Sequence, residues 1–266
     1  MQKGETCKDK YINKQYKSKQ GYIMTVIDYK WNNDVTVQFD DEFKTVKHHC
    51  RIDRIRSGDI ANPNHPTVFG VGIIGENPYP ITINGVNTRE YYIWHAMIQR
   101  CYDPNWKPSN AKFNSYEDCY VDKRWHLYNN FYEWVHEQDN YIKWANGGFH
   151  IDKDILVKGN KVYSPETCCL VPAYVNMMFV KCDNSRTDLP LGVYKCYNKY
   201  KVLVGDPITN KRVYLGLYNT VEEAFFAYKN YKENLIKQVA KTEYNNGNII
   251  KKCYESMMNY EVEITD

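Results

Sequence analysis

The feature that most constrains the fold is a β-rich segment that begins near residue 192 and leads into a helix. Three short stretches alternate apolar and polar side chains and are joined by tight turns: 192–196, 200–204 and 212–217. Beyond them, Thr220 and Glu223 have the spacing of a capping box, and Ala224, Ala227 and Tyr228 begin a helical repeat. The segment therefore predicts three antiparallel strands with one helix packed across them.

A second unit precedes this sheet. Residues 149–156 and 168–171 have the composition of strands, and the polar stretch between them contains Gly159, Asn160 and Pro165. Pro172 suits the first turn of a helix that carries Asn176. The sequence therefore predicts a β-loop-β-α unit.

Residues 87–145 have a helical, aromatic-rich pattern. Asn87 and Glu90 have capping-box spacing, and a second helix is expected after Asn130. A short helix start is expected near residue 115. The tryptophans of this region are expected to pack a core rather than to stack on bases: Trp94, Trp125 and Trp134.

The N-terminal part has a different character. Residues 20–60 alternate as short strands and predict a small five-stranded barrel, without a motif that specifies a ligand. The first twenty residues are rich in lysine and predict a mobile basic arm, and Pro and Gly punctuate residues 61–81 as in a linker. Residues 241–266 are expected to form a partly ordered tail.

The predicted fold class is α+β. It comprises an N-terminal small β-barrel, a helical lead-in to a ββα core, and a C-terminal three-stranded sheet with one helix. The expected domains are 1–81 with arm, barrel and linker, 82–187 with the ββα core, and 188–266 with the sheet and tail.

Composition excludes several classes of protein. Nine cysteines, an odd number without a CxxC pair, argue against a disulfide framework or a structural zinc site and for reduced thiols. Neither a signal peptide nor an apolar run long enough to span a membrane is recognised, so a cytoplasmic protein is expected. The net charge of +3 does not by itself require a nucleic-acid partner.

The β-loop-β-α unit carries the residues that a metal-dependent ββα nuclease needs. Such an enzyme uses a histidine on the first strand to activate water, a loop asparagine to orient the imidazole, and metal ligands on the strand and the helix. His150, Asn160 and Asn176 occur in that order.

Together with the preceding helices, this unit resembles the HNH homing-endonuclease group that is common in phage genomes. The resemblance covers about a third of the chain and implies that His150 and Asn160 are catalytic. It also implies that Asp152 and Asn176 hold Mg²⁺ or Mn²⁺. The residues that carry it are 94–102, Trp125, Phe131, Trp134, 150–156, Asn160, 163–166 and Asn176.

Two departures leave the activity open. Phe149 stands where active members have a metal-binding His or Asp, and Thr167 stands where a second loop asparagine is expected. The chain is therefore either a DNA endonuclease or a binding protein. A binding protein would have an inactive nuclease scaffold and would hold no metal. The second alternative would act as a regulator, or as an anti-defence factor that engages a host nucleoprotein complex targeting nucleic acid.

The C-terminal unit resembles the plant ethylene-response (Apetala-type) DNA-binding domain, which is also attached to phage HNH proteins. The resemblance spans about 50 residues: 192–194, 199–204, 212–218, 220–224 and 227–228. It implies that the sheet enters the major groove of double-stranded DNA. It also implies that the protein acts in the cytoplasm of a bacterial host. The expected DNA-binding residues are Tyr194, Lys195, Lys199, Tyr200, Lys201, Arg212 and Tyr214.

Few of these residues are arginines, and this composition predicts the mode of binding. Tyr194 and Cys196 occupy positions where arginine is common in the family, whereas Arg212 is retained. Lysines contact phosphates without reading sequence, so we expect salt-dependent binding with weak sequence specificity.

Overall fold

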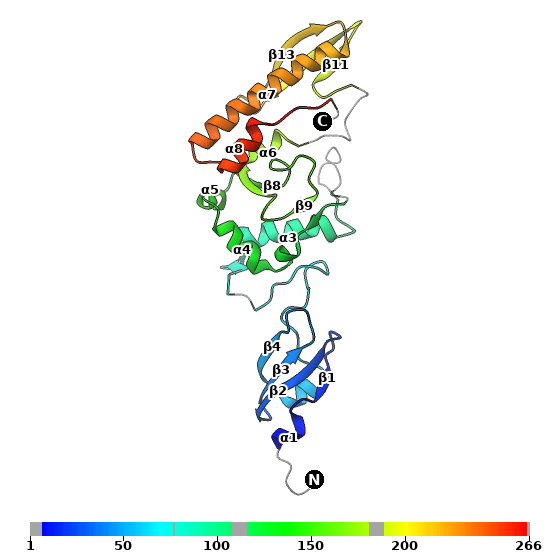
Figure 1. Ribbon diagram of the computed structural model, residues 1–266, viewed down its shortest axis with the longest axis vertical. Coiled ribbons are helices and arrows are strands. Elements are labelled where there is room, and N and C mark those ends of the chain that lie inside the picture. Colours follow the sequence, from blue (N-terminus) through cyan, green and yellow to red (C-terminus); the bar gives the residue numbers. More distant parts are fainter. Residues whose placement is uncertain (1–6, 77, 108–115, 117, 181–188, 265–266) are drawn as a thin grey trace. The chain divides into compact units, whose positions relative to one another are not determined.

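The computed structural model describes residues 7–76, 78–107, 116, 118–180 and 189–264 (Figure 1). The protein is a mixed α+β protein with two compact units. The first contains residues 1–80 and 126–129, and the second contains residues 81–125 and 130–266. The division into three domains at residues 82 and 188 stays a prediction.

The N-terminal unit contains a four-stranded antiparallel sheet with the strand order β1-β2-β3-β4. Alternate side chains of its central strands, such as Met24 and Val37, are fully buried. The described residues do not close into a barrel, so the prediction of a five-stranded barrel was wrong. The elements are α1 (Cys7–Tyr11), β1 (Gln15–Lys17), β2 (Ile23–Trp31), β3 (Asp34–Phe39), β4 (Val46–Cys50) and α2 (Ile52–Arg56).

The N-terminal arm is ordered from residue 7 onward, contrary to the prediction. Tyr11, Ile12 and Tyr16 pack against the core of the sheet, and β1 pairs with β2. These side chains and the pairing of β1 with β2 attach the segment to the sheet. The basic composition that suggested a mobile arm describes only the exposed side of the segment.

The second unit begins with a small hairpin and a group of helices. The cap of α3 is Thr88, whose hydroxyl accepts a hydrogen bond from the Tyr91 amide, and not Asn87, which pairs in β6. α4 begins at Tyr128, two residues before the predicted Asn130. The elements are β5 (Thr82–Ile83), β6 (Val86–Asn87), α3 (Arg89–Tyr102), β7 (Tyr120–Val121), a 3₁₀ turn (Lys123–His126), α4 (Tyr128–His136) and α5 (Tyr141–Ala145).

The tryptophans of these helices form a core, as predicted. Trp94 and Trp125 are almost fully buried, and the Trp94 indole N–H donates to the Trp125 carbonyl at 2.7 Å. The rings of Trp125 and Trp134 lie 4.6 Å apart. The short helix expected near residue 115 falls mostly outside the described residues.

The predicted β-loop-β-α unit is present. β8 (Phe149–Asp152) pairs antiparallel with β10 (Cys169–Pro172), which leads directly into α6 (Ala173–Met177). Within the loop, β9 (Val162–Tyr163) pairs in parallel with β7. β8 ends at Asp152, four residues earlier than predicted, because the Asp152 carboxylate accepts the Asp154 and Ile155 amides and turns the chain.

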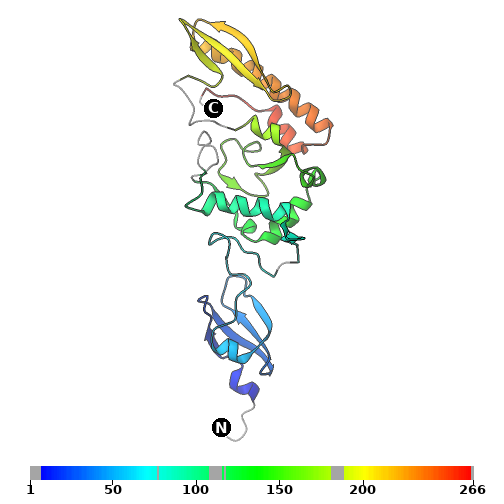
Figure 2. The ribbon, with the colours of Figure 1, turned by 180° about the vertical axis from the view of Figure 1, so that it is seen from behind.

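The C-terminal sheet confirms the strand prediction. It consists of β11 (Val193–Cys196), β12 (Lys199–Asp206) and β13 (Lys211–Tyr218), in that order. α7 (Val221–Asn245) follows with the predicted capping box between Thr220 and Glu223. The helix lies along one face of the sheet, in front of it in Figure 1 and behind it in Figure 2.

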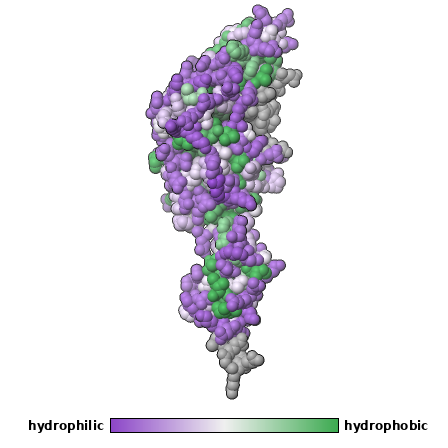
Figure 3. Space-filling view, viewed as in Figure 1, coloured by the Kyte–Doolittle hydropathy of each residue, from purple (hydrophilic) through white to green (hydrophobic). Residues whose placement is uncertain are grey.

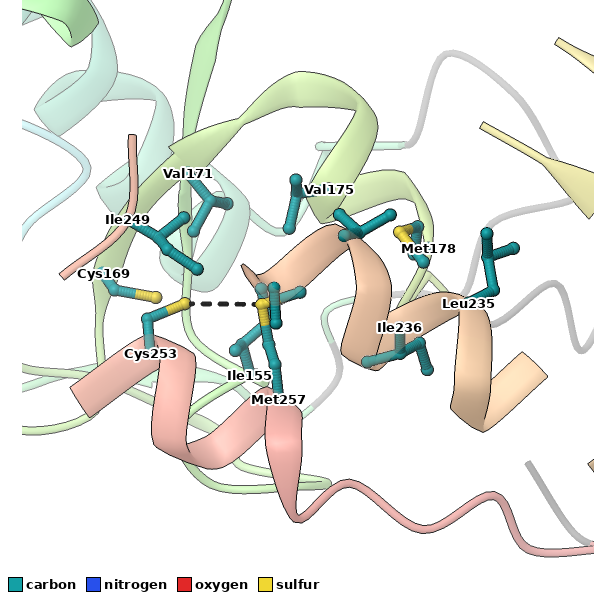
Figure 4. Close-up of a cluster of buried hydrophobic side chains, with 12 residues drawn as sticks. Ile155, Cys169, Val171, Val175, Met178, Leu235, Ile236, Ile249, Cys253 and Met257 are labelled. Atoms are coloured by element: carbon teal, nitrogen blue, oxygen red, sulfur yellow. Dashed lines mark hydrogen bonds between the residues drawn. The ribbon is translucent and has the colours of Figure 1, made fainter. Parts of the chain in front are cut away.

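Residues 241–264 are more ordered than predicted. α7 runs to Asn245, and α8 (Lys251–Met258) folds back against it. Figure 4 shows the resulting cluster, in which the Cys253 sulfur lies 3.9 Å from the Met257 sulfur. The cluster joins β10 and α6 to the second half of α7 through Ile155, Cys169, Val171, Val175, Met178, Leu235, Ile236, Val239, Ala240, Ile249, Cys253 and Met257.

Gly192 provides a test of the packing between α7 and the sheet. Its backbone has a φ of +77°, and a Cβ there would collide with the Tyr228 ring and lie 2.9 Å from the Leu203 carbonyl oxygen. We expect Gly192→Ala to lower the free energy of unfolding by about 2–5 kcal/mol, from backbone strain plus overpacking. Urea titration followed by circular dichroism measures this.

Gly159→Ala is the matched control, because Gly159 has a φ of +72° with no atom within 4 Å of the added Cβ. Only the backbone term applies there, so the expected loss is about 1–2 kcal/mol. Equal losses for the two variants would contradict the assigned packing of Tyr228.

Candidate nucleic-acid interface

The strand register decides which side chains the C-terminal sheet exposes. Val193, Val202 and Val204 are buried against Ala224 and Tyr228 of α7, so the opposite face of the sheet is free of the helix. Cross-strand partners share a face in an antiparallel sheet. We call the face opposite α7 the open face. Five of the predicted DNA-binding residues lie on it: Tyr194, Lys199, Lys201, Arg212 and Tyr214.

The other two predicted residues lie on the side that α7 covers. Tyr200 pairs with Lys195 on one side and with Tyr218 on the other, and both tyrosines pack against the α7 cluster. The Lys195 side chain is exposed at the edge of this row. The structure therefore separates Tyr200 and Lys195 from the five residues of the open face.

The open face is both cationic and apolar. Tyr194 is 43% exposed, Tyr214 56% and Leu217 47%. Tyr194 pairs with Lys201, and Lys201 pairs with Leu217, so a cation lies between two apolar side chains. A tyrosine with an apolar ring and a polar tip suits such a mixed, solvent-exposed surface. Figure 3 shows the opposite side, on which α7 lies, and there hydrophilic side chains cover most of this end of the molecule, with smaller apolar patches among them.

The cations of the open face are available to a ligand. Among the residues that the structure describes, no carboxylate forms an ion pair with Lys199, Lys201 or Arg212. The nearest acid in the sheet, Asp206, accepts hydrogen bonds from Ile208 and Thr209 in its own turn. These hydrogen bonds lower the pKa of Asp206.

Sequence reasoning missed two exposed residues at this surface. Leu217 belongs to the open face by simple strand alternation, so its period-two position was a usable signal. Tyr197 is 94% exposed at the turn between β11 and β12, with a φ of 54°. Nothing in the local pattern distinguishes Tyr197 from an ordinary turn residue.

The second predicted site centres on His150 of β8. The pairing of β8 with β10, which continues into α6, brings the Asn176 amide nitrogen to 3.1 Å from His150 Nδ1. Arg89 of α3 donates to the Phe149 carbonyl at 2.7 Å. Desolvation, followed by the positive charges of Arg89 and Arg100, lowers the pKa of His150. The imidazole is therefore neutral at pH 7 and can accept a proton.

Asn160 does not contact this imidazole. Its amide donates to the carbonyls of Lys153 and Val162 at 2.8 and 2.6 Å, and its oxygen accepts the Val162 amide. Thr167, at the second loop position, also donates to the Val162 carbonyl, at 2.7 Å. Both side chains hold the loop between β8 and β10, so the residue that contacts the imidazole is the helical Asn176.

The predicted metal ligand Asp152 has a structural role in the loop. Its side chain is buried, and one carboxylate oxygen accepts the Asp154 and Ile155 amides at 2.8 and 2.7 Å. Desolvation raises its pKa to about 6. The neighbouring Asp154 carboxylate pairs with Lys153 at 2.8 Å.

These donors do not fit Mg²⁺ or Mn²⁺. Both ions favour carboxylate and carbonyl oxygens, whereas the surface pair His150–Asn176 offers one imidazole and one amide near two arginines. Across the described part of the chain, no group of three or more His, Cys, Asp or Glu side chains is placed to hold a metal ion.

Comparisons with known proteins assign no function to the chain, so its function has to be argued from the geometry described above. Family models, curated proteins and solved structures give no significant match to the chain. No helix in the described residues is long and apolar enough to cross a membrane. The open face and the His150–Asn176 pair are thus the two surfaces from which a function can be argued.

Removing the charge of the Asp152 side chain tests its structural role in the loop. Asp152→Asn keeps the oxygen that accepts both amides but removes the buried charge. We expect this variant to be more stable than the wild type at pH 7, by up to about 3 kcal/mol. Because the folded-state pKa is raised to about 6, the advantage should shrink as the pH falls from 6 towards the ordinary aspartate range.

Urea titrations at pH 7 and at pH 4 measure this difference. Asp152→Ala serves as the control, since it removes the charge together with both hydrogen bonds. A loss of stability in Asp152→Asn at pH 7 would contradict the structural role.

Proposed function

We propose that this protein binds double-stranded DNA through the open face of its C-terminal sheet. The observation that carries the proposal is the strand register. It puts Lys199, Lys201 and Arg212 on the same face as two exposed tyrosines, Tyr194 and Tyr214, and α7 covers the other face. These cations have no carboxylate partner among the described residues.

The shape and chemistry of the open face support a duplex ligand. A major groove about 12 Å wide admits β-strands, and a helix behind the sheet leaves the groove-facing side clear. Lysines would contact phosphates on either side, and the tyrosine rings would pack on sugars and base edges. Arg212 is the one arginine on this face of the strands. Base discrimination is therefore small, because each bidentate arginine–guanine contact contributes about 1–3 kcal/mol.

We propose further that the ββα unit is a scaffold, and not a metal-dependent nuclease. What supports this is the donor set, in which Asp152 stabilises the loop while His150 and Asn176 lie beside Arg89 and Arg100. A protein of this kind would regulate DNA, or would antagonise a host complex that targets nucleic acid, by occupying the duplex.

The salt dependence of duplex binding tests the open face. Each phosphate contact contributes about 0.9 to the slope of log K against log salt. We expect Lys199→Ala/Lys201→Ala to reduce the slope by about 1.8, and to weaken binding similarly on unrelated duplexes. Fluorescence anisotropy with a labelled 20-base-pair duplex at several salt concentrations measures it.

The matched control is Lys195→Ala/Lys241→Ala, which removes the same charge away from the open face. Its slope should stay close to that of the wild type. If both double variants reduced the slope equally, binding would not be confined to the open face.

Plasmid nicking tests the scaffold proposal. With Mg²⁺ or Mn²⁺, we expect the wild type and His150→Ala to leave supercoiled plasmid equally intact, because the imidazole lacks an acidic metal ligand beside it. Gel electrophoresis over a time course, with a known nuclease as positive control, measures this. Metal-dependent nicking that disappears in His150→Ala would show that the site is catalytic.

A further inference from the structure

The open face of the C-terminal sheet has cations at its two ends and apolar side chains between them. Lys199 lies at one end of β12, and Arg212 lies opposite Gly205 at the other end. Leu217 is 47% exposed, and Leu203 is half-buried. The side chains with an apolar surface lie beside Lys201 in the two middle rows of cross-strand partners: Tyr194, Leu203, Tyr214 and Leu217.

The spacing of these rows suits the width of a major groove. Residues 199–205 of β12 span about 20 Å, because a strand rises about 3.4 Å per residue. The major groove of B-form DNA is about 12 Å wide. A sheet whose strands cross the groove would therefore have its end cations at the phosphates and its middle rows over the base edges.

The middle rows offer apolar contact in place of hydrogen bonds to bases. Adenine and cytosine are recognised by amide and carboxylate side chains. Among the described residues of β11, β12 and β13, those on the open face include no Asn, Gln, Asp or Glu. The apolar group that the major groove presents is the C5-methyl group of thymine. Leu203 and Leu217 can cover such a group without leaving a polar atom unpaired.

We propose that Leu203 and Leu217, together with the rings of Tyr194 and Tyr214, contact the C5-methyl groups of pyrimidines in the major groove. The ligand is then duplex DNA rich in thymine, or in cytosine that carries a methyl group at the same ring position. This inference rests on the proposed binding of DNA by the open face and adds a base preference to it. Each methyl group that is buried strengthens binding about fourfold, so the preference is for base composition and not for one site.

Removal of the methyl groups alone tests the proposal. A labelled A·T-rich duplex is compared, by fluorescence anisotropy at one salt concentration, with the same duplex carrying deoxyuridine in place of every thymidine. The two duplexes have the same charge and the same hydrogen-bonding groups, so Lys201 and Arg212 contribute equally to both. We expect the full-length protein to bind the uracil duplex at least about threefold more weakly. Equal affinities would overturn the proposal.

Addition of methyl groups is the reciprocal experiment. A G·C-rich duplex with 5-methylcytosine in place of cytosine should bind at least about threefold more tightly than the unmodified duplex. An affinity that falls or stays the same would overturn the proposal, since the response to uracil would then come from the shape of the duplex. Failure to bind any of these duplexes would overturn the proposed function itself, whereas binding without a methyl preference would overturn this inference alone.

Leu217→Ala attributes the preference to the open face. We expect this variant to reduce the ratio of thymine-duplex to uracil-duplex affinity at least about twofold, and Leu191→Ala to keep the wild-type ratio. Leu191 is a matched control, because it is 39% exposed and lines a depression beside α7 with Tyr228, away from the open face. Each ratio is measured on one protein preparation, so a partial loss of folded protein cancels. A wild-type ratio in Leu217→Ala would overturn the proposal.

Discussion

The arrangement of the second unit depends on the packing of α7 along two different partners. The first turns of the helix bury Ala224 and Tyr228 against the C-terminal sheet. Its later turns bury Ile236 and Val239 against β10, α6 and α8. Each fully buried side chain of the size of Val, Leu or Ile contributes about 1.5–3 kcal/mol. One continuous helix of 25 residues therefore ties the sheet to the ββα unit.

This packing also selects the face that the sheet presents to a ligand. Side chains along a strand alternate between faces, so a slip of one residue would exchange the two sets. Such a slip would turn Val202 and Val204 to solvent and bury Lys201 under the helix. The cost of burying a lysine without a counterion, added to the lost apolar burial, fixes the register. The positions of the buried valines along the strands therefore determine that the lysines between them face away from α7.

Local signals in the sequence predicted the elements of this unit well, and tertiary contacts explain where prediction failed. The three strands and the Thr220 cap depend on neighbouring residues and were found. Tyr200 and Lys195 were assigned from the resemblance to a DNA-binding family, although strand alternation alone puts them opposite Lys199 and Lys201. The last residues were expected to form a tail because their burial, as at Cys253, depends on strand β10, which is distant in sequence.

The nuclease-type residues show the same difference between what local sequence predicts and what tertiary contacts determine. Their order along the chain was a sound guide to the β-loop-β-α topology, since His150, Asn160 and Asn176 do fall on its strand, loop and helix. The order of residues along the chain does not determine which groups each side chain contacts in the folded protein. Asp152 is engaged by the two amides that end β8, and Asn160 spans the loop.

The contact that the described residues make with the His150 imidazole is that of Asn176, and the charges of Arg89 and Arg100 lower its pKa after desolvation. One imidazole and one amide, with two positive charges acting on the imidazole, are poorly suited to holding a divalent cation. Because α7 packs against both the C-terminal sheet and the β10–α6 region, the open face and the His150–Asn176 pair belong to one packed unit.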